Sequence, residues 1–256
     1  MRYVSALLVI CFVFSCSTKR PQGKTEAEVL YKEAQELMED GRYMLATERL
    51  NNLRSKHPYS FYATPAELLQ ADILFEQENY VEAAASYVLF KDFHPKHKKI
   101  TYVVWRIAES FYNQLPSTYD RDLSSASEAI SYYRELLRVH PQSEYASKAK
   151  KRIKKCEEML REKEKYIADF YFKTDEYGAA RFRYRKILEN FENTELKKHA
   201  MLRILRATAQ LDEKKACENY YRAFQGSFPS ESLKELDSAY QNCRQGKTAS
   251  GGWFDW

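Results

Sequence analysis

Histidine, serine and glycine are the residues whose spacing would reveal catalysis or metal binding most directly. His94 and His97 are closely spaced, but no carboxylate or third histidine joins them at helical spacing, as a metal site would require. Three of the five histidines instead stand directly before a proline, at His57, His94 and His140. The serines lack a G-x-S-x-G turn, and no glycine-rich phosphate loop is present. We therefore predict no enzyme, no catalytic residue, no metal and no cofactor.

The N-terminal residues have the pattern of an export signal that ends near a cysteine. A positively charged start at Met1–Tyr3 is followed by the apolar stretch Ala6–Phe14 and then by Ser15 and Cys16. That stretch is far shorter than the ~20 residues that a membrane-spanning helix needs. It is typical of an export signal that is removed from the mature protein.

The residues just before Cys16 have a recognisable pattern. Val13-Phe14-Ser15-Cys16 resembles a bacterial lipobox, in which a small residue precedes a cysteine that becomes acylated, although Phe14 is larger than usual. The resemblance predicts a signal peptide at 1–15, a palmitate-bearing Cys16 and a lipidated tether at 16–24. Ser17 replaces the aspartate usual in inner-membrane retention, which implies the outer membrane. The alternative is an ordinary cleaved signal with an incidental cysteine.

The other cysteines of the mature chain are Cys156, Cys217 and Cys243. An exported protein can form disulfides, and Cys217–Cys243 is one candidate pair. The sequence alone does not decide the pairing.

The composition favours helices over sheets. Glycine and proline number only 7 each among 256 residues, and charged residues make up 30%. The formal charge of +5 is spread along the chain, and no nucleic-acid signature accompanies it. Tyrosine is unusually frequent, at 20 residues, and suits half-buried surfaces and binding grooves.

The chain repeats itself from Thr25 onward. Four residues recur 37 positions later: Ala34, Tyr43, Ala46 and Pro58 return as Ala71, Tyr80, Ala83 and Pro95. Small alanines let paired helices approach closely, and each proline ends a second helix. Pattern and period resemble the tetratricopeptide repeat. We expect an all-α tetratricopeptide-repeat superhelix of about five helix pairs with a C-terminal capping helix.

The later repeats are less regular. The third contains extra residues around Leu115–Asp122, a continuous helix from about 144 to 174 joins it to the fourth, and the fifth keeps only its second helix in register. Residues 230–244 are typical of a capping helix. The predicted divisions are N-terminal units 1–3 at 25–143, C-terminal units 4–5 with the cap at 144–244, and a flexible aromatic tail at 245–256.

Each first helix also presents a second stripe of residues. Positions three before, one after and four after the central alanine lie together, about 100° around the helix from the packed stripe. The first three repeats place mainly apolar and aromatic residues there, whereas the fourth places Lys165, Asp169 and Phe172. We predict a substrate-binding groove lined by Tyr31, Met38, Leu68, Phe75, Tyr102, Trp105 and Tyr112. The alternative is that these rings pack between repeats as ordinary core.

A closer likeness rests on four stretches: His57–Ala63, Tyr119–Asp122, His140–Ala146 and Ala168–Phe191. With the signal and the repeats, they resemble the BamD family, the tetratricopeptide-repeat lipoproteins of the outer-membrane β-barrel assembly machine, over roughly residues 16–230.

The resemblance implies a non-enzymatic scaffold, lipid-anchored at the periplasmic face of the outer membrane. Its N-terminal repeats would receive unfolded outer-membrane proteins. Its C-terminal repeats would hold a BamA-like barrel-folding subunit, beside other lipoproteins of the machine, and Arg181 and Arg185 are assigned to that contact. The alternative function is another adaptor, such as a pilotin for secretin assembly.

Two further segments invite binding hypotheses. The basic run Lys148–Lys155 is either a solvated helix face or a contact for an acidic partner or lipid head groups. Three large rings in the tail, Trp253, Phe254 and Trp256, are costly to leave in water. We expect them to dock on another subunit, in the protein's own N-terminal groove, or on the last helix.

Overall fold

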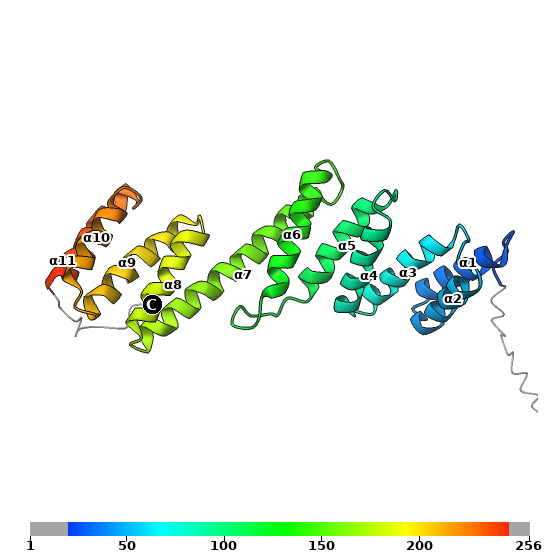
Figure 1. Ribbon diagram of the computed structural model, residues 1–256, viewed down its shortest axis with the longest axis horizontal. Coiled ribbons are helices and arrows are strands. Elements are labelled where there is room, and N and C mark those ends of the chain that lie inside the picture. Colours follow the sequence, from blue (N-terminus) through cyan, green and yellow to red (C-terminus); the bar gives the residue numbers. More distant parts are fainter. Residues whose placement is uncertain (1–19, 246–256) are drawn as a thin grey trace, which may run out of the picture. The chain divides into compact units, whose positions relative to one another are not determined.

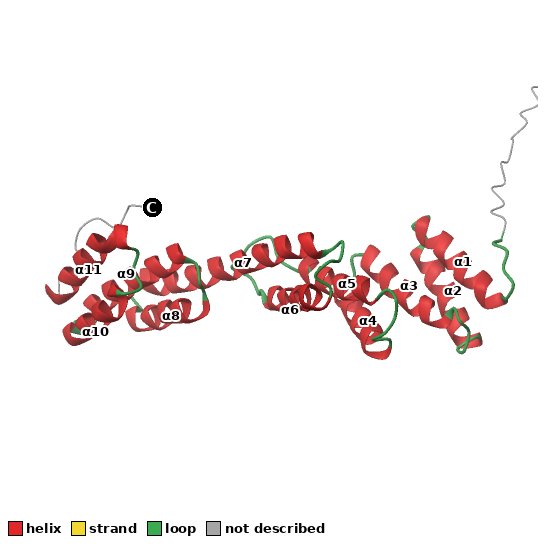
Figure 2. Ribbon diagram, turned by 90° about the horizontal axis from the view of Figure 1, so that it is seen from above, coloured by secondary structure: helices red, strands yellow, loops and turns green. Residues whose placement is uncertain are grey.

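The computed structural model describes residues 20–245, and every regular element among them is a helix (Figures 1 and 2). The α-helices are, in chain order, α1 Glu26–Glu39, α2 Tyr43–Lys56, α3 Ala63–Glu76, α4 Tyr80–Phe93, α5 Ile100–Asn113, α6 Ser124–Val139, α7 Ala146–Lys173, α8 Tyr177–Asn190, α9 Thr194–Gln210, α10 Lys214–Gln225 and α11 Leu233–Gln245. These are five successive helix pairs and a last single helix, so the predicted all-α tetratricopeptide-repeat class is confirmed.

The turns within four of the pairs share one backbone device. A single residue in each adopts the left-handed conformation, with φ between 52° and 71°: Gly41, Glu78, Asp175 and Asp212. The amide of the next residue then donates to a carbonyl five residues earlier, as from Arg42 to Leu37 at 2.7 Å. This hydrogen bond satisfies a carbonyl that the end of the first helix leaves open. The turns therefore repeat along the chain with the same backbone conformation, as the helices do.

Proline ends the second helices where the sequence places it. α2 stops at Lys56, two residues before Pro58, and α6 stops at Val139, two residues before Pro141. His57 and His140 occupy the C-cap positions of these helices.

The chain divides into two compact units, the first ending at Ser86 and the second beginning at Tyr87, within α4. In the first unit, the central alanines Ala34, Ala46 and Ala71 have no exposed surface. Leu50 and Leu53 of α2 fill the core that these small residues leave between α1, α2 and α3. The third repeat belongs to the second unit, whereas the functional division expected at 143/144 stays a prediction.

The second unit contains α5 to α11, and its longest helix serves two repeats. α7 runs for 28 residues, close to the predicted span of 144–174. It packs against α6 and also against α8. One helix thereby closes the core of the third repeat and supplies the first helix of the fourth.

Tyrosine has a role in this unit that composition does not reveal. Tyr87, Tyr133 and Tyr184, one from each of α4, α6 and α8, have no exposed surface. Each hydroxyl is satisfied by a polar residue of a first helix, because a buried polar group without a partner costs free energy. The partners are Arg106, Glu109 and Asp169 respectively.

The C-terminal end of the described chain is covalently closed. Cys217 of α10 and Cys243 of α11 form a disulfide, with 5.9 Å between their Cα atoms, so the candidate pair is confirmed. Cys156 is buried and free, and burial raises the pKa of its thiol to about 11. α11, with the short 3-10 turn Ser230–Ser232 before it, matches the predicted capping helix. The predictions for the signal, Cys16 and the aromatic tail lie outside the described residues.

Candidate binding faces of the repeats

The first-helix face of the N-terminal unit holds four of the predicted groove residues. Tyr31 is half-buried, and its pKa is raised by burial first and by the charge of Asp72 second, which places α1 and α3 side chains together. Met38 and Phe75 are half-buried as well. Leu68 is only 3% exposed, so its assignment to an open groove is corrected: the side chain lies in the core. Tyr31, Met38 and Phe75 remain the candidate face of this unit.

Trp105 of α5 also needs correction. Its ring is 5% exposed and stacks on Tyr145 with 5.1 Å between centroids. Lys148 Nζ, from the first turn of α7, lies 5.0 Å from the same ring. The start of α7 therefore covers Trp105, and the ring is core in this arrangement.

Two other predicted rings of the third repeat lie half-buried beneath cations. The guanidinium of Arg152 sits 3.9 Å from the centre of the Tyr112 ring, and that of Arg106 sits 5.6 Å from the Tyr102 ring. Such contacts contribute about 0.5–1 kcal/mol at exposed sites. Tyr102 and Tyr112 are thus partly accessible, but α7 side chains occupy one face of Tyr112.

A buried carboxylate explains part of the basic run in α7. Glu109 is 6% exposed and accepts hydrogen bonds from the Tyr133 hydroxyl and from Arg152 Nε, the latter at 3.2 Å. Lys148 Nζ lies 3.3 Å from its other oxygen. A buried charge must be paired, so Lys148 and Arg152 have a structural role that the sequence hypotheses omitted. Their spacing of four residues on one helix face was the available signal.

The face of the fourth repeat is polar and tightly connected. Asp169 of α7 accepts a hydrogen bond from the Tyr184 hydroxyl at 2.5 Å and from Lys165 Nζ at 2.8 Å. His199 Nε2 of α9 lies 2.9 Å from the same carboxylate. Burial alone would raise the pKa of Asp169, but hydrogen bonds from His199, Lys165 and Tyr184 outweigh it and hold that pKa below its usual range. The predicted residues Lys165 and Asp169 are therefore brought together, with two partners that the stripe did not include.

Replacing this carboxylate should change how stability depends on acid. A depressed pKa means that the ionised carboxylate stabilises the fold above about pH 3.9, the unfolded value, and that this contribution is lost as the pH falls. We expect Asp169→Asn to lower the free energy of unfolding by about 2 kcal/mol at pH 7 and to lose part of the acid sensitivity. Urea unfolding at pH 7 and pH 3 measures both, with Asp92→Asn on α4 as the exposed control. An unchanged acid sensitivity in Asp169→Asn would contradict this assignment.

The two arginines assigned to partner contact differ in their surroundings. Arg181 forms a two-pronged ion pair with Glu213, which lies just before α10, and Nη2 is 3.1 Å from Oε1. Arg185, one turn further along α8, is exposed. Phe182, between them in sequence, is 56% exposed. Arg181 thus ties α8 to the next repeat, and Arg185 with Phe182 offers the accessible surface of α8.

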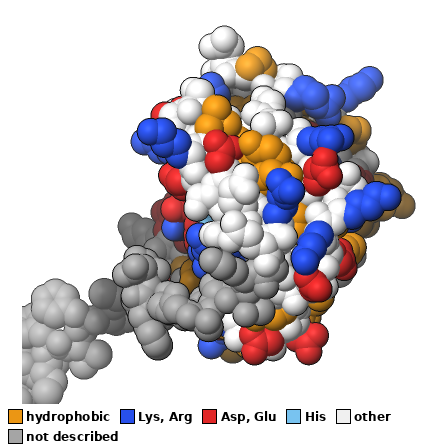
Figure 3. All heavy atoms as spheres, turned by 90° about the vertical axis from the view of Figure 1, so that its left-hand side faces the viewer, with side chains coloured by type: hydrophobic (Ala, Val, Ile, Leu, Met, Phe, Trp, Pro, Cys, Tyr) orange, Lys and Arg blue, Asp and Glu red, His pale blue; other side chains and the backbone are white. Residues whose placement is uncertain are grey.

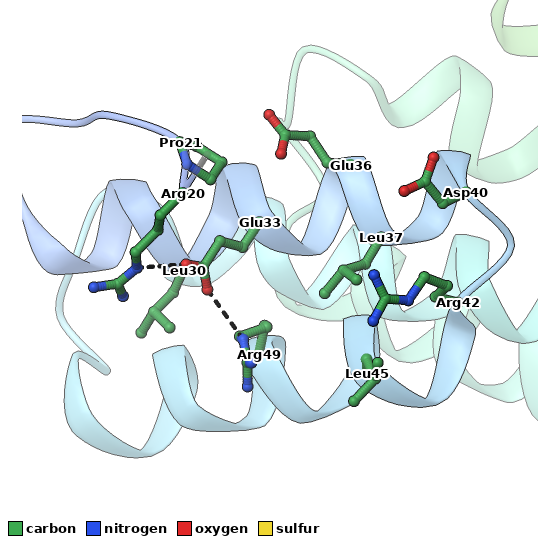
Figure 4. Close-up of a pocket in the computed structure, with 10 residues that line it drawn as sticks. All are labelled: Arg20, Pro21, Leu30, Glu33, Glu36, Leu37, Asp40, Arg42, Leu45 and Arg49. Carbon is green, nitrogen blue, oxygen red and sulfur yellow. Dashed lines mark hydrogen bonds and ion pairs between the residues drawn. The ribbon is translucent and has the colours of Figure 1, made fainter. Parts of the chain in front are cut away.

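A hollow of about 530 Å³ lies along the first helix pair (Figure 4). Arg20, Glu33 and Arg49 point toward one another on its wall, with Arg49 Nε 3.0 Å from the Glu33 carboxylate. Leu30, Leu37 and Leu45 supply its apolar lining. Sequence analysis did not predict this hollow, because Arg20 of the tether region completes it.

Residues 20–245 contain neither a metal-binding cluster nor a membrane-spanning helix. No group of three or more His, Cys, Asp or Glu side chains in that range is placed to hold a metal ion. Nor does any helix in that range have the length and apolarity needed to cross a bilayer.

Paired helices with central alanines, a recurring left-handed turn and mixed aromatic and charged first-helix faces define a repeat protein of the tetratricopeptide type. A family model described as YfiO, outer membrane lipoprotein, matches residues 23–222. The chain therefore belongs to the YfiO family.

Curated relatives agree with this assignment. Outer membrane protein assembly factor BamD of Neisseria gonorrhoeae is 29% identical over 211 residues, which cover 79% of each chain. The BamD proteins of Rickettsia prowazekii and Vibrio cholerae are 27% and 26% identical and are covered over 92% of their length, against 90% and 82% of this chain. A solved yeast structure, "TPR2AB-domain:pHSP90-complex of yeast Sti1", is 16% identical with a TM-score of 0.43 and covers 86% of this chain and 99% of that one. That score is too low to support a conclusion about ligands.

Proposed function

We propose that this chain is a non-enzymatic assembly factor for outer-membrane β-barrel proteins, anchored to the periplasmic face of the outer membrane through Cys16. Its first-helix faces receive unfolded outer-membrane proteins, and its C-terminal repeats bind a BamA-like barrel-folding subunit. The observation that carries the proposal is the YfiO family match over residues 23–222, with BamD relatives aligned over most of their length.

The described faces support a division of labour. In the N-terminal unit, half-buried Tyr31, Met38 and Phe75 offer apolar surface to an extended, aromatic-rich chain. In the C-terminal unit, exposed Phe182 and Arg185 on α8 have the aromatic and arginine chemistry that is enriched where proteins bind each other. Arg181 supports that surface through its ion pair with Glu213.

Affinity purification from solubilised outer membranes, read by mass spectrometry, tests the proposal. We expect a barrel-folding subunit and further lipoproteins of its machine to be recovered with the full chain. Phe182→Ala with Arg185→Glu should reduce the recovered subunit by about tenfold or more, since an interface aromatic or arginine often contributes ~2 kcal/mol. Arg138→Glu, an exposed charge on α6, is the matched control. Recovery of a secretin in place of a barrel-folding subunit would instead make the protein a pilotin-like adaptor.

Removal of the anchor has a direct consequence. We expect Cys16→Ser to release the protein from membranes into the aqueous phase of a detergent phase separation. Acyl chains hold a protein at a bilayer by ~0.8 kcal/mol for each buried methylene, so their loss leaves little attachment. The chain that keeps Cys16 should be found in the detergent phase. If that form already partitions into water, the anchor is refuted.

A further inference from the structure

The C-terminal end of α11 lies beside the second half of α9. Near the start of α11, Ser232 Oγ and Glu235 Oε1 lie 2.9 and 3.0 Å from Lys198 Nζ. Near its end, Cys243 Sγ lies 3.1 Å from the carbonyl oxygen of Leu205. α11 therefore runs parallel to α9, and residues 246–256 continue from a point next to the second half of α9.

That half of α9 carries two arginines, and the first of them contacts α7. The Arg203 guanidinium lies 4.8 Å from the centre of the buried Phe172 ring. Arg206, three residues on, is exposed and makes no hydrogen bond or ion pair with any residue in the range 20–245. Partial desolvation first, and the like charge of Arg203 second, lower the pKa of Arg206, while Tyr184 and Glu235 act in the opposite direction. We call Phe172, Arg203 and Arg206 the α7–α9 face.

The carboxylates around this face are already paired. Asp169 accepts from Tyr184 and Lys165 and contacts His199, and Glu235 is paired with Lys198. The face is therefore positively charged, and the Arg203 guanidinium covers the buried Phe172 ring. On the end that carries α10 and α11, basic, acidic and apolar side chains are intermixed (Figure 3). A ligand that combines aromatic rings with a carboxylate has the matching chemistry.

The sequence 253–256, Trp-Phe-Asp-Trp, has that combination. The seven residues 246–252 precede it and include Gly246, Gly251 and Gly252. Seven extended residues span up to about 25 Å. Arg206 follows Leu205, whose carbonyl oxygen contacts Cys243 near the end of α11. The segment can thus reach the face without any change in the helices.

We propose that residues 253–256 bind in cis to the α7–α9 face, with Asp255 paired to Arg206 and the tail rings packed against the guanidinium groups of Arg203 and Arg206. A linker of seven residues gives an effective concentration on the order of mM, so an intrinsic Kd of about 1 mM already fills half of the sites. Such weak binding leaves the segment displaceable by a partner with a similar aromatic and acidic stretch. The tail then acts as an internal competitor for this face. The inference does not depend on the proposed function.

Tryptophan quenching by acrylamide tests the contact in the full chain. Two of the three tryptophans are Trp253 and Trp256, and the third, Trp105, is 5% exposed and forms a protected baseline. We expect Arg206→Glu to raise the quenching constant at least about twofold, because loss of an mM-range cis contact exposes both tail rings. Arg138→Glu, an exposed charge on α6, should leave it unchanged. Equal quenching in the unsubstituted chain and in Arg206→Glu overturns the proposal.

A peptide of residues 247–256 gives a second readout on a chain truncated after Gln245. The truncated chain should bind this peptide at least about twofold more tightly than the full chain does, since its face is no longer occupied. Arg206→Glu in the truncated chain should abolish that binding. Equal affinity for both chains, or protection of the tryptophans that grows with protein concentration, overturns binding in cis.

Discussion

Trp105→Ala is expected to lower the free energy of unfolding of the unit that begins at Tyr87 by about 3–5 kcal/mol. The ring is 5% exposed, stacks on Tyr145, and lies beside Tyr133 with 5.5 Å between centroids. Lys148 covers it from α7. Truncation would leave a cavity between α5, α6 and α7 that three rigid helices cannot close. Urea unfolding followed by circular dichroism measures the loss.

Phe93→Ala is the matched control for this truncation. Phe93 is also a large ring in the same unit, but it is 71% exposed, so its removal should change stability by no more than about 0.5 kcal/mol. If Trp105→Ala leaves stability unchanged but weakens the binding of aromatic-rich peptides, Trp105 lines the groove and is not a core residue. A loss shared equally by Phe93→Ala would show that ring size, and not burial, sets the effect.

Trp105 also shows where sequence reasoning about the site stops. Helical geometry fixes which residues of one helix share a face. The position of the central alanine is therefore enough to predict the second stripe of each first helix. Whether that stripe meets solvent depends on the next helix in space. Tyr31 and Phe75 stay partly accessible, whereas Trp105 is covered because α7 begins beside α5 with Tyr145 and Lys148. No spacing rule within α5 contains that information.

The fold itself was far more predictable, because its signals are local and repeated. Gly41 and Glu78, 37 residues apart, both take the left-handed turn conformation, and α2 stops just before Pro58 as the proline requires. The boundary between compact units was not predictable in this way. It falls inside α4, where neither composition nor a breaker residue marks it.

The sequence also did not predict the buried hydrogen bonds between tyrosine hydroxyls and carboxylates. Tyr133 and Tyr184 read as ordinary second-helix aromatics in the sequence, and Glu109 and Asp169 as members of a first-helix stripe. Only the packing of second helices on first helices brings each hydroxyl to its carboxylate. Long-range pairings of this kind have no local signature, and the same holds for cysteine pairing.

Reduction of the Cys217–Cys243 disulfide is expected to lower the free energy of unfolding of the C-terminal repeats by about 3–4 kcal/mol. The two cysteines are 26 residues apart, and opening a loop of that length restores conformational entropy to the unfolded chain. The disulfide links α10 directly to α11, which also packs on α9 and α10. Both sulfurs are almost fully buried, so reductant acts mainly on transiently opened molecules.

The experiment compares urea unfolding with and without dithiothreitol for the native chain and for Cys217→Ala/Cys243→Ala. The reduced native chain and the double variant should have similar stabilities, and dithiothreitol should leave the double variant unchanged. Cys156 provides an internal check, because its buried thiol, with a pKa raised to about 11, should resist iodoacetamide until the fold opens. Faster labelling of Cys156 after reduction would mean that the disulfide restrains the whole unit. Unchanged labelling with lower stability would confine its effect to α10 and α11, and a native chain indifferent to dithiothreitol would refute the stabilising role.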